Sequence, residues 1–378
     1  MEQTRLQMVQ ERGNGFYVWN GKVYQSDIVR ACIHPKVKAV GKLVGKHLRR
    51  SIQTNGDKRL QVNPEFYIRH LLEEPNPYMT GQKLQEKLAN QLCLNNNAFA
   101  VILRDDFDFP KEIYPIPALS ADASYDKQGR LYLRFLFQNG KNYIFPYSDV
   151  IHLRQDFNEN DIFGDSPAPA LAPLMEIVST TDQGIVKAIR NSSVIRWLLR
   201  FNQSLRPEDI QANVKAFADN FLSIEKGGYG VAGTDTKMDA TQIDPKDYVP
   251  NAAQMDRTTA RIYSLFGTNE AIVQSKYTED QWTAYYESEI EPVVLELGGE
   301  YTRKLFSQRE RGHGNSIVFE ASNLATASMA TKLNLCQMVD RGALTPNEWR
   351  SVLNLAPLPG GDQPIRRLDT AAVGGESE

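Results

Sequence analysis

The pattern of apolar and polar residues changes along this chain. Segments before Gly164 are short, rich in β-branched and aromatic residues and bounded by turn residues, which predicts strands. From Ala168 to Asn191 apolar residues recur in steps of four and three, which predicts one helix about 35 Å long. The predicted strands are Phe99–Arg104, Arg130–Phe137, Tyr143–Phe145 and Asp149–Arg154, and the helical face carries Leu174, Val178, Thr181, Ile185 and Ile189.

Turn and breaker residues delimit the other elements of the N-terminal half. Asn20-Gly21 and Asn139-Gly140 each predict a tight hairpin turn. We expect a helix from Ser26 to about Gly45, with an interruption at Pro35. This half is therefore predicted to be α+β. Two more helices, Pro64–Glu73 and Thr80–Leu94, are separated by the breaker Pro75-Asn76-Pro77.

The C-terminal half reads as two long helices around a small insert. Ser166 is a candidate N-cap for the first helix, and Lys246–Phe266 is predicted to be the second. Asn269–Lys276 is predicted to be a loop, and Thr278 to cap a long helix that reaches Ser307 with a kink at Pro292. The remaining predictions are a strand at Val194–Phe201, a helix at Pro207–Leu222, strands at Met238–Ile243 and Ser316–Glu320, helices at Ala327–Arg341 and Pro346–Leu353, and a disordered end beyond Pro357.

The charge of the chain is nearly balanced overall but unevenly distributed. The formal net charge is −3, whereas a protein that grips DNA tightly usually has a clear basic excess. Residues 36–59 carry eight Lys and Arg against one acid, and residues 277–302 carry seven acids and no Lys or Arg. Either block can be a solvated helix face. Because the chain has no basic excess, any contact with DNA should be weak.

Composition and spacing exclude several other classes. No apolar run approaches the roughly 18–20 residues that span a bilayer, and the first residues do not resemble a secretion signal. Cys32, Cys93 and Cys336 are three widely spaced cysteines, which favours reduced thiols in a cytosolic setting. The five histidines have no metal-ligand spacing, so neither a metal nor a cofactor is predicted. His152 is expected to be a hydrogen-bonded core residue.

Motifs that could signal catalysis fail in their context. Gly228–Gly233 fits G-x-G-x-x-G but is predicted to follow a helix instead of a strand. Gly41–Lys46 falls short of a phosphate-binding loop by one residue and lacks the final Ser or Thr. Asp105, Asp106 and Asp108 read as a solvated turn because the glycine and distal glutamate of a calcium loop are absent. Trp282, Tyr285 and Tyr286 lie among acids, so we expect them to pack in the interior and not to stack on bases.

Several short motifs together resemble the portal proteins of tailed double-stranded DNA bacteriophages, siphovirus type. Asp149–Arg154 is similar to the family's Asp-[Val/Ile]-[Ile/Val]-His-[Ile/Leu]-Arg strand, and Gly164–Pro167 to the Gly-x-Ser-Pro start of its stem helix. The matches keep the family's order from about Val29 to Asp362. The others are Leu71-Leu72 with Pro75-Asn76 and Thr80, Asn97–Ala100, Ala260–Gly267 without the family's following Val-Pro-Pro, and Gly342–Arg350.

The resemblance implies an α+β portal fold with a defined order of parts. It places a wing at residues 1–165, a first stem helix at 166–193, an α/β clip at 194–245 and a second stem helix at 246–267. The next parts are a tunnel loop at 268–277 and a long kinked spine helix with a return strand at 278–325. The last part is a helical crown with a flexible tail at 326–378. Twelve copies would form a ring at one capsid vertex that nucleates the head and conducts DNA during packaging and ejection.

The resemblance also implies partners and site residues. The partners are other copies of the chain, double-stranded DNA without sequence preference, the terminase large subunit, a head-tail adaptor and the major capsid or scaffold protein. The expected location is the virion, after assembly in the host cytoplasm, with no membrane and no enzymatic activity. The channel would be lined by Lys187, Arg190, Asn269, Glu270, Gln274, Ser275 and Lys276, and the clip would present Arg196, Arg200, Arg206 and Tyr229 to the terminase or adaptor.

Two alternatives remain open from the residues alone. Lys187 and Arg190 lie in a segment without acids, from Gln183 to Arg206, so they can pair with acids of a neighbouring copy or touch DNA phosphates. The rival to a portal is a soluble nucleic-acid-processing enzyme with an unrecognised active site. Such an enzyme predicts a monomer or small oligomer and a deep pocket with perturbed titratable groups. The mass of the oligomer distinguishes the two.

Overall fold

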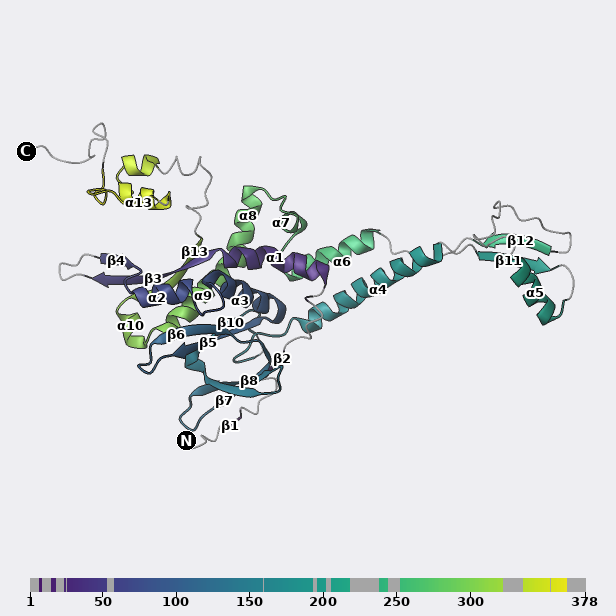
Figure 1. Cartoon of the computed structure of the whole chain (residues 1–378), viewed down its shortest axis with the longest axis horizontal. Helices are drawn as coiled ribbons and strands as arrows, with labels where there is room; N and C mark the ends of the chain where they lie inside the picture. The colour runs from purple at the N-terminus through teal and green to yellow at the C-terminus, as the bar shows by residue number, and fades with distance from the viewer. Residues whose placement is uncertain are drawn as a thin grey trace, which may run out of the picture. The chain divides into compact units, whose positions relative to one another are not determined.

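The computed structural model describes residues 7–8, 15–17, 24, 26–52, 58–158, 160–192, 196–201, 205–217, 238–243, 252–321, 336–353 and 355–365. Contacts divide the chain into two compact units (Figure 1). One unit is Met1–Pro169 with Ile262–Glu378, and the other is Ala170–Arg261. The larger unit mixes helices with small antiparallel sheets, so the predicted α+β class is confirmed.

Two three-stranded sheets organise the core of the larger unit. Their strand orders are β10-β5-β6 and β13-β3-β4, and every pair is antiparallel. In the first sheet His152 lies opposite Phe99, and in the second Ile317 lies opposite His47. The strands are β10 (Val150–Arg154), β5 (Asn97–Arg104), β6 (Pro110–Pro115), β13 (Asn315–Ala321), β3 (Leu43–Ile52) and β4 (Lys58–Val62).

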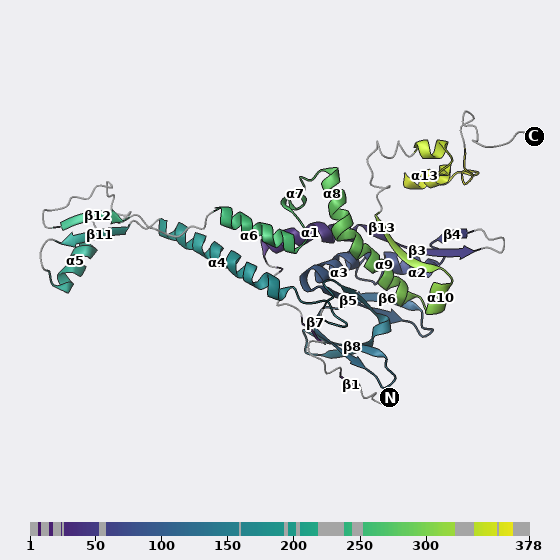
Figure 2. The same ribbon diagram turned by 180° about the vertical axis from the view of Figure 1, so that it is seen from behind.

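Helices pack on both of these sheets. Helix α3 contacts β5 and α1, whereas α9 contacts β10 and β13 and so bridges the two sheets (Figure 2). The shared core includes the buried side chains of Leu88, Ile151, Leu297 and Ile317, and burial of such side chains is the main favourable term in folding. The helices are α1 (Asp27–Gly41), α2 (Phe66–Glu73), α3 (Gly81–Asn95), α9 (Glu291–Leu305) and α10 (Gln308–Gly312).

A third sheet has its own small core. Its order is β1-β7-β8-β9, with β2 also paired to β7. Phe99 of β5 packs its ring 5.1 Å from that of Phe135 in β8 and 6.1 Å from that of Phe163. This aromatic cluster joins the third sheet to the first. Its elements are β1 (Gln7–Met8), β2 (Gly15–Tyr17), β7 (Ala118–Tyr125), β8 (Leu131–Phe137), β9 (Asn142–Pro146) and the 3-10 turn η2 (Tyr147–Asp149).

The smaller unit contains the predicted insert between long helices. Strands β11 (Arg196–Phe201) and β12 (Met238–Ile243) pair antiparallel and α5 (Pro207–Phe217) lies between them in sequence, as predicted. Helix α4 (Ala168–Ser192) confirms the long helix read from the apolar pattern. Helix α6 (Ala252–Leu265) covers the described part of the second, since residues 246–251 lie outside the described ranges.

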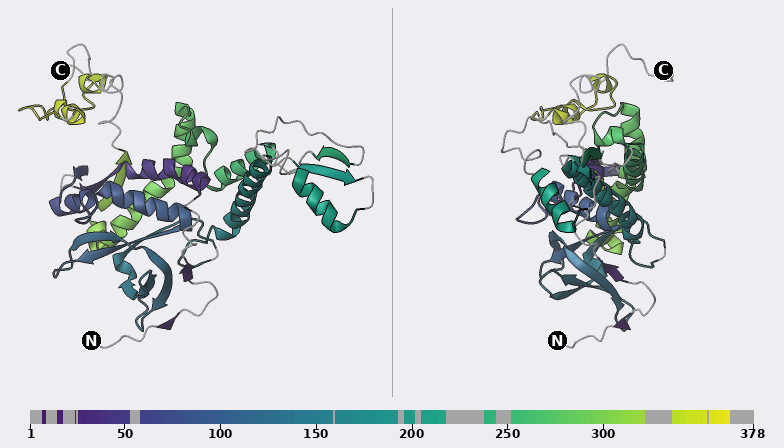
Figure 3. Two further views of the ribbon diagram at one scale, coloured as in Figure 1. Left: turned by 45° about the vertical axis from the view of Figure 1, so that its right-hand side comes forward. Right: turned by 90° about the vertical axis from the view of Figure 1, so that its right-hand side faces the viewer.

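After α6 the chain forms a corner of short helices. This corner consists of α7 (Glu270–Val273) and α8 (Glu279–Tyr285), shown in green next to the purple helix α1 in Figure 3. Thr278 caps α8 as predicted. The predicted long helix is interrupted by a π-helical turn, η5 (Tyr286–Ile290), and Pro292 lies just after this turn, in the first turn of α9.

Some N-terminal predictions were wrong. The first helix ends at Gly41, not near Gly45, because Leu43–Gly45 pairs with β13. Pro35 lies inside α1 without ending it. Phe16 lies opposite Ala121 of β7, and the turn of the hairpin predicted at Asn20-Gly21 lies outside the described residues. Strands β4, β6 and β7 were missed.

The last described segments agree with the sequence where they can be compared. Helix α13 (Pro346–Val352) begins at the predicted proline. Helical residues are described from Cys336 to Asp340, whereas residues 327–335 and the tail beyond 365 lie outside the described ranges. None of the described helices is long and apolar enough to span a membrane.

Candidate functional site

The segment predicted to be a tunnel loop begins with a tightly closed helix end. Gly267, at φ +62°, follows α6 and donates its N–H to the Ser264 carbonyl at 3.2 Å, and Thr268 donates to Tyr263 at 2.9 Å. This pair of bonds is the Schellman arrangement, which favours glycine because it needs a left-handed residue. The direction of the chain after α6 is therefore fixed by backbone hydrogen bonds.

A single helical turn, α7, replaces the predicted loop. The Asn269 side chain caps it by accepting from the Ile272 N–H at 3.0 Å. Ser275, at φ +57°, ends the turn, with bonds from its own N–H to Ile272 and from Lys276 to Ala271. Ile272 is only 1% exposed and belongs to the main core. The segment predicted to be a loop therefore contains one helical turn, and Ile272 anchors this turn in the core.

The polar residues of this turn lie on its exposed side. Asn269, Glu270, Gln274, Ser275 and Lys276 are all exposed. The Gln274 amide donates to the Glu270 carboxylate at 2.6 Å, one turn away along the chain. This bond orients two of the five side chains predicted to face DNA. Lys276 supplies the positive charge of the segment, just beyond the end of α7.

A partly buried ion pair stabilises the α7–α8 corner. Lys36 of α1 lies 2.9 Å from the carboxylate of Glu289 in η5, with side-chain exposures of 8% and 28%. A Cβ added at Gly267 would lie 2.2 Å from the carboxyl carbon of Glu289. The carboxylate therefore occupies the space that a side chain would need at the end of α6. Residues from α1, α6 and η5 thus hold the corner together, which the sequence did not reveal.

The other predicted channel and clip residues lie in the smaller unit. Lys187 and Arg190 come from α4, three residues apart, and Lys187 is exposed. Arg196 and Arg200 lie on β11 opposite Ile243 and Asp239 of β12, and Arg200 is exposed. Arg206 is exposed and immediately precedes α5. Tyr229 lies outside the described residues, as does Gly228–Gly233.

Three residues from separate sequence motifs meet where the larger unit leads into α4. The Asn97 side chain accepts from the Gly164 N–H at 2.9 Å and donates to the Gly164 carbonyl at 2.8 Å. The same Asn97 oxygen lies 3.1 Å from Nε2 of His152. His152 is buried, and burial followed by the charges of Arg154 and Lys304 keeps its pKa well below the usual value. His152 is thus the expected hydrogen-bonded core residue.

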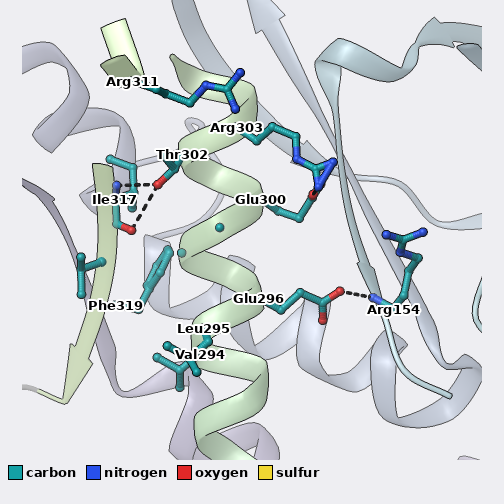
Figure 4. Close-up of a pocket in the computed structure, with 13 residues that line it drawn as sticks. Arg154, Val294, Leu295, Glu296, Glu300, Thr302, Arg303, Arg311, Ile317 and Phe319 are labelled. Carbon is teal, nitrogen blue, oxygen red and sulfur yellow. Dashed lines mark hydrogen bonds and ion pairs between the residues drawn. The ribbon is translucent and has the colours of Figure 1, made fainter. Parts of the chain in front are cut away.

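Helix α9 lines a pocket of about 550 Å³ between the two bridged sheets (Figure 4). On one side the Glu296 carboxylate accepts from the Arg154 backbone N–H at 2.7 Å, and Glu300 accepts from that of His152 at 3.4 Å. Residues four apart on a helix and residues two apart on a strand are both separated by about 6–7 Å. The two carboxylates therefore have the same spacing as the backbone N–H groups of Arg154 and His152 on the unpaired edge of β10. On the other side Thr302 exchanges two hydrogen bonds with Ile317.

Burial perturbs two ionisable groups around this pocket. It raises the pKa of the Glu296 carboxyl to about 7, against the opposing effect of the Arg154 N–H. It also lowers the pKa of the Lys304 ammonium to about 8, against the attraction of Glu300. Lys304 donates to the Tyr147 carbonyl and lies 3.6 Å from the Tyr147 ring centre. Both side chains form hydrogen bonds to backbone groups, so we assign them a structural role in stabilising the sheets.

Two motifs considered for chemistry have clear structural roles. Asp105 accepts from the N–H groups of Phe107 and Phe109, as expected for a solvated turn. Gly41–Lys46 follows a helix and leads into strand β3, the reverse of the order in a phosphate-binding loop. In the part of the chain that is described, no cluster of three or more His, Cys, Asp or Glu could hold a metal ion.

Comparison of the sequence with protein families gives one match, to the family described as phage portal protein, over residues 27–354. Among curated proteins, the portal protein of Enterobacteria phage HK97 is 22% identical over 84% of this chain and 76% of its own length. A probable portal protein of Lactococcus phage p2 is 24% identical over 70% of this chain and 68% of its own.

Solved structures with a similar fold cover nearly the whole chain. A chain from the neck of an empty gene transfer agent particle, computed with C6 symmetry, has a TM-score of 0.63 at 13% identity and covers 93% of this chain and 98% of its own. The crystal structure of an HK97-family phage portal protein from Corynebacterium diphtheriae has a TM-score of 0.53 at 11% identity, covering 83% and 98%. At these identities the likeness establishes the fold alone.

Proposed function

The chain belongs to the phage portal protein family, and from this premise we propose that its copies form a ring around a DNA channel at one vertex of a phage capsid. The ring serves head assembly, genome packaging and genome ejection. The observation that carries the proposal is the family match over residues 27–354, joined to a fold shared over nearly the full length of a particle-neck chain. A related neck structure was computed with C12 symmetry, which favours twelve copies in the virion.

Exposed apolar residues on α4 support the ring. Ile177, Val186 and Ile189 are 45%, 47% and 63% exposed. Large apolar side chains on a helix normally pack against another element, and a neighbouring copy supplies one in a ring. Assembly would cover these three side chains.

The channel residues suit weak contact with DNA. Lys187 and Arg190 on α4, and Lys276 beyond α7, would repeat around the ring as separated girdles of positive charge. Tight neutralisation of many phosphates would slow translocation, whereas a few screened contacts let the duplex slide. The exposed side of α7, with Asn269, Glu270, Gln274 and Ser275, would add polar groups beside Lys276.

The insert between α4 and α6 is the proposed docking platform for other proteins. Arg196, Arg200, Arg206 and Tyr229 would face the terminase large subunit during packaging and the head-tail adaptor afterwards. The capsid or scaffold protein would contact the ring in the virion, after assembly in the host cytoplasm. The function is mechanical, and we propose that the chain itself catalyses no reaction and uses no cofactor.

Imaging of the purified chain tests the proposal directly. Negative-stain microscopy and native mass spectrometry at modest salt should reveal closed rings with a central hole and a mass near twelve chains. A monomer at high concentration, with or without scaffold protein, would contradict the ring. It would favour the rival hypothesis of a soluble enzyme.

A further inference from the structure

A groove of about 530 Å³ lies beside the α7–α8 corner and is lined by cations along one of its sides. Arg30, His34, Lys38 and Lys42 contribute to the lining from α1 and its C-cap, at steps of four residues. Steps of four keep side chains on one helix face about 6 Å apart. Ala31 and Ala39 lie between them and keep the groove open. We call these four basic positions the basic stripe.

The opposite wall of the groove is apolar and aromatic. Ile272 and Val273 come from α7, Trp282 comes from α8, and Tyr277 immediately precedes the N-cap of α8. The rings of Tyr277 and Trp282 stack with their centres 5.0 Å apart. A groove with cations on one side and aromatic surface on the other suits a protein segment that carries both carboxylates and carbon chains.

The groove has an excess of positive charge. No carboxylate belongs to its lining. Lys38 pairs with Glu86 at 3.0 Å, but neither Arg30 nor Lys42 forms an ion pair within the described ranges, and both are exposed. Arg30 lies 5.4 Å from the ring centre of Tyr24. Two cations of the basic stripe are therefore available to a partner.

The outer side of the same corner has the opposite charge. Asp280, Glu287 and Glu291 are exposed, and we call them the acidic ridge. Asp280 and Glu287 are two and five residues from Trp282, which at about 100° per residue places them roughly 140–160° around the helix from it. Trp282 faces the groove. The acidic ridge therefore points away from the basic stripe.

We propose that the acidic ridge of one copy docks into the basic stripe of the next copy in the ring. This inference rests on the proposed ring. A ring of identical subunits needs two different, complementary surfaces on each subunit, and the α7–α8 corner carries both. Both surfaces also have charges at helical spacing, so several pairs can form at once. Such pairs favour orientation and association and weaken with added salt.

Nucleic acid is the other polyanion that a basic stripe could accept. The acidic ridge favours a second copy, because the chain itself supplies exposed charges of the opposite sign on a helical surface. A net charge of −3 is also poor support for a dedicated phosphate site. DNA binding at the groove is therefore treated as an outcome that would overturn the proposal.

Charge reversal in two separate chains gives a sharp test. One variant carries Arg30→Glu with Lys42→Glu, and the other Asp280→Lys with Glu287→Lys. Each alone should form at least about tenfold fewer rings than the wild type, because like charges then meet at every interface. An equal mixture should regain rings of alternating copies, since each altered surface finds its complement. Native mass spectrometry measures both results, and the two variants differ in mass.

Controls separate the possible failures. Lys127→Glu with Lys141→Glu makes the same charge change on exposed turns and should leave rings intact. Thermal melts followed by circular dichroism check folding, and Asp280→Asn with Glu287→Gln replaces any variant that does not fold. Normal rings in both reversed variants, or no recovery on mixing, would overturn the proposal, as would normal rings with impaired DNA retention. Absence of rings in the wild type would instead contradict the proposed function.

Discussion

The side chain of Asn97 exchanges two hydrogen bonds with the backbone of Gly164, accepting at 2.9 Å and donating at 2.8 Å. Gly164 has little room to move, since an added Cβ would lie 2.2 Å from the Gln155 carbonyl oxygen. Asn97 is 1% exposed, so no water replaces these bonds. The link fixes the chain just before α4 begins.

Asn97→Ala should destabilise the larger unit by about 2–4 kcal/mol, because it leaves the Gly164 N–H and carbonyl buried without partners. Urea unfolding followed by fluorescence measures the change. Asn139→Ala is the matched control: Asn139 is exposed and accepts one hydrogen bond from Lys141 at 3.0 Å, so its loss should cost below about 1 kcal/mol. Equal losses for the two variants would contradict this role of Asn97.

The free energy of unfolding should decrease as the pH rises from about 4.5 to about 7, because of Glu296. Its pKa is raised from 4.5 to about 7 in the folded protein, so the folded state binds the proton more tightly than the unfolded state. Glu296→Gln keeps an oxygen for the Arg154 N–H and removes the charge. It should raise the free energy of unfolding at pH 8 by about 1–3 kcal/mol and leave it nearly unchanged at pH 4. The exposed Glu176→Gln on α4 serves as control, and a destabilised Glu296→Gln at pH 8 would refute the reasoning.

Gly267→Ala should destabilise the corner more than Gly140→Ala destabilises its turn. Both glycines have positive φ, +62° and +73°, so both variants incur backbone strain of about 1–2 kcal/mol. Only at Gly267 would the new Cβ also displace Glu289 from Lys36, whereas nothing lies within 4 Å at Gly140. We expect an additional loss of about 1–2 kcal/mol at Gly267 in chemical denaturation. Equal effects would show that the ion pair adapts freely.

Lys276→Ala should leave ring formation intact and alter the length or leakage of packaged DNA. Lys276 is exposed, whereas Ile272 in the same segment is buried in the core. Ile272→Ala should therefore cost about 2–4 kcal/mol of stability and reduce ring yield. Complementation of a portal-deficient phage, with heads scored by microscopy and DNA by nuclease protection, separates the two. Deletion of residues 270–275 is not a clean test, because it also removes the Ile272 anchor. Full-length, stable packaging by Lys276→Ala would contradict its proposed contact with DNA.

The purified chain should hydrolyse neither ATP nor DNA. Gly41–Lys46 runs from a helix into a strand. The side chain of His152 is buried, and its Nε2 is hydrogen-bonded to Asn97. Assays with Mg²⁺ and with other divalent metals measure turnover. Activity that follows the chain through purification and is lost on one point substitution would contradict a purely mechanical role.

The sequence alone determined the elements whose signals are local. The apolar rhythm predicted α4, the Thr278 capping signal predicted the start of α8, and a short run of apolar residues predicted β10. Each depends on residues within a few positions of one another, where spacing and side-chain chemistry act directly. The order of short motifs predicted the family for the same reason: it is a property of the linear chain.

The tertiary structure decided the features that depend on distant partners. Leu43–Gly45 is a strand only because β13 lies beside it, and Lys36 is buried only because η5 brings Glu289 to it. Helix α7 has four residues, too few for a periodic signal, and it forms because Asn269 caps it and the core holds Ile272. Glu296 and Glu300 read as solvated acids in the sequence, yet they bond the edge of β10. Hydrogen bonds and burial between distant segments override local propensity, so these sites required the folded chain.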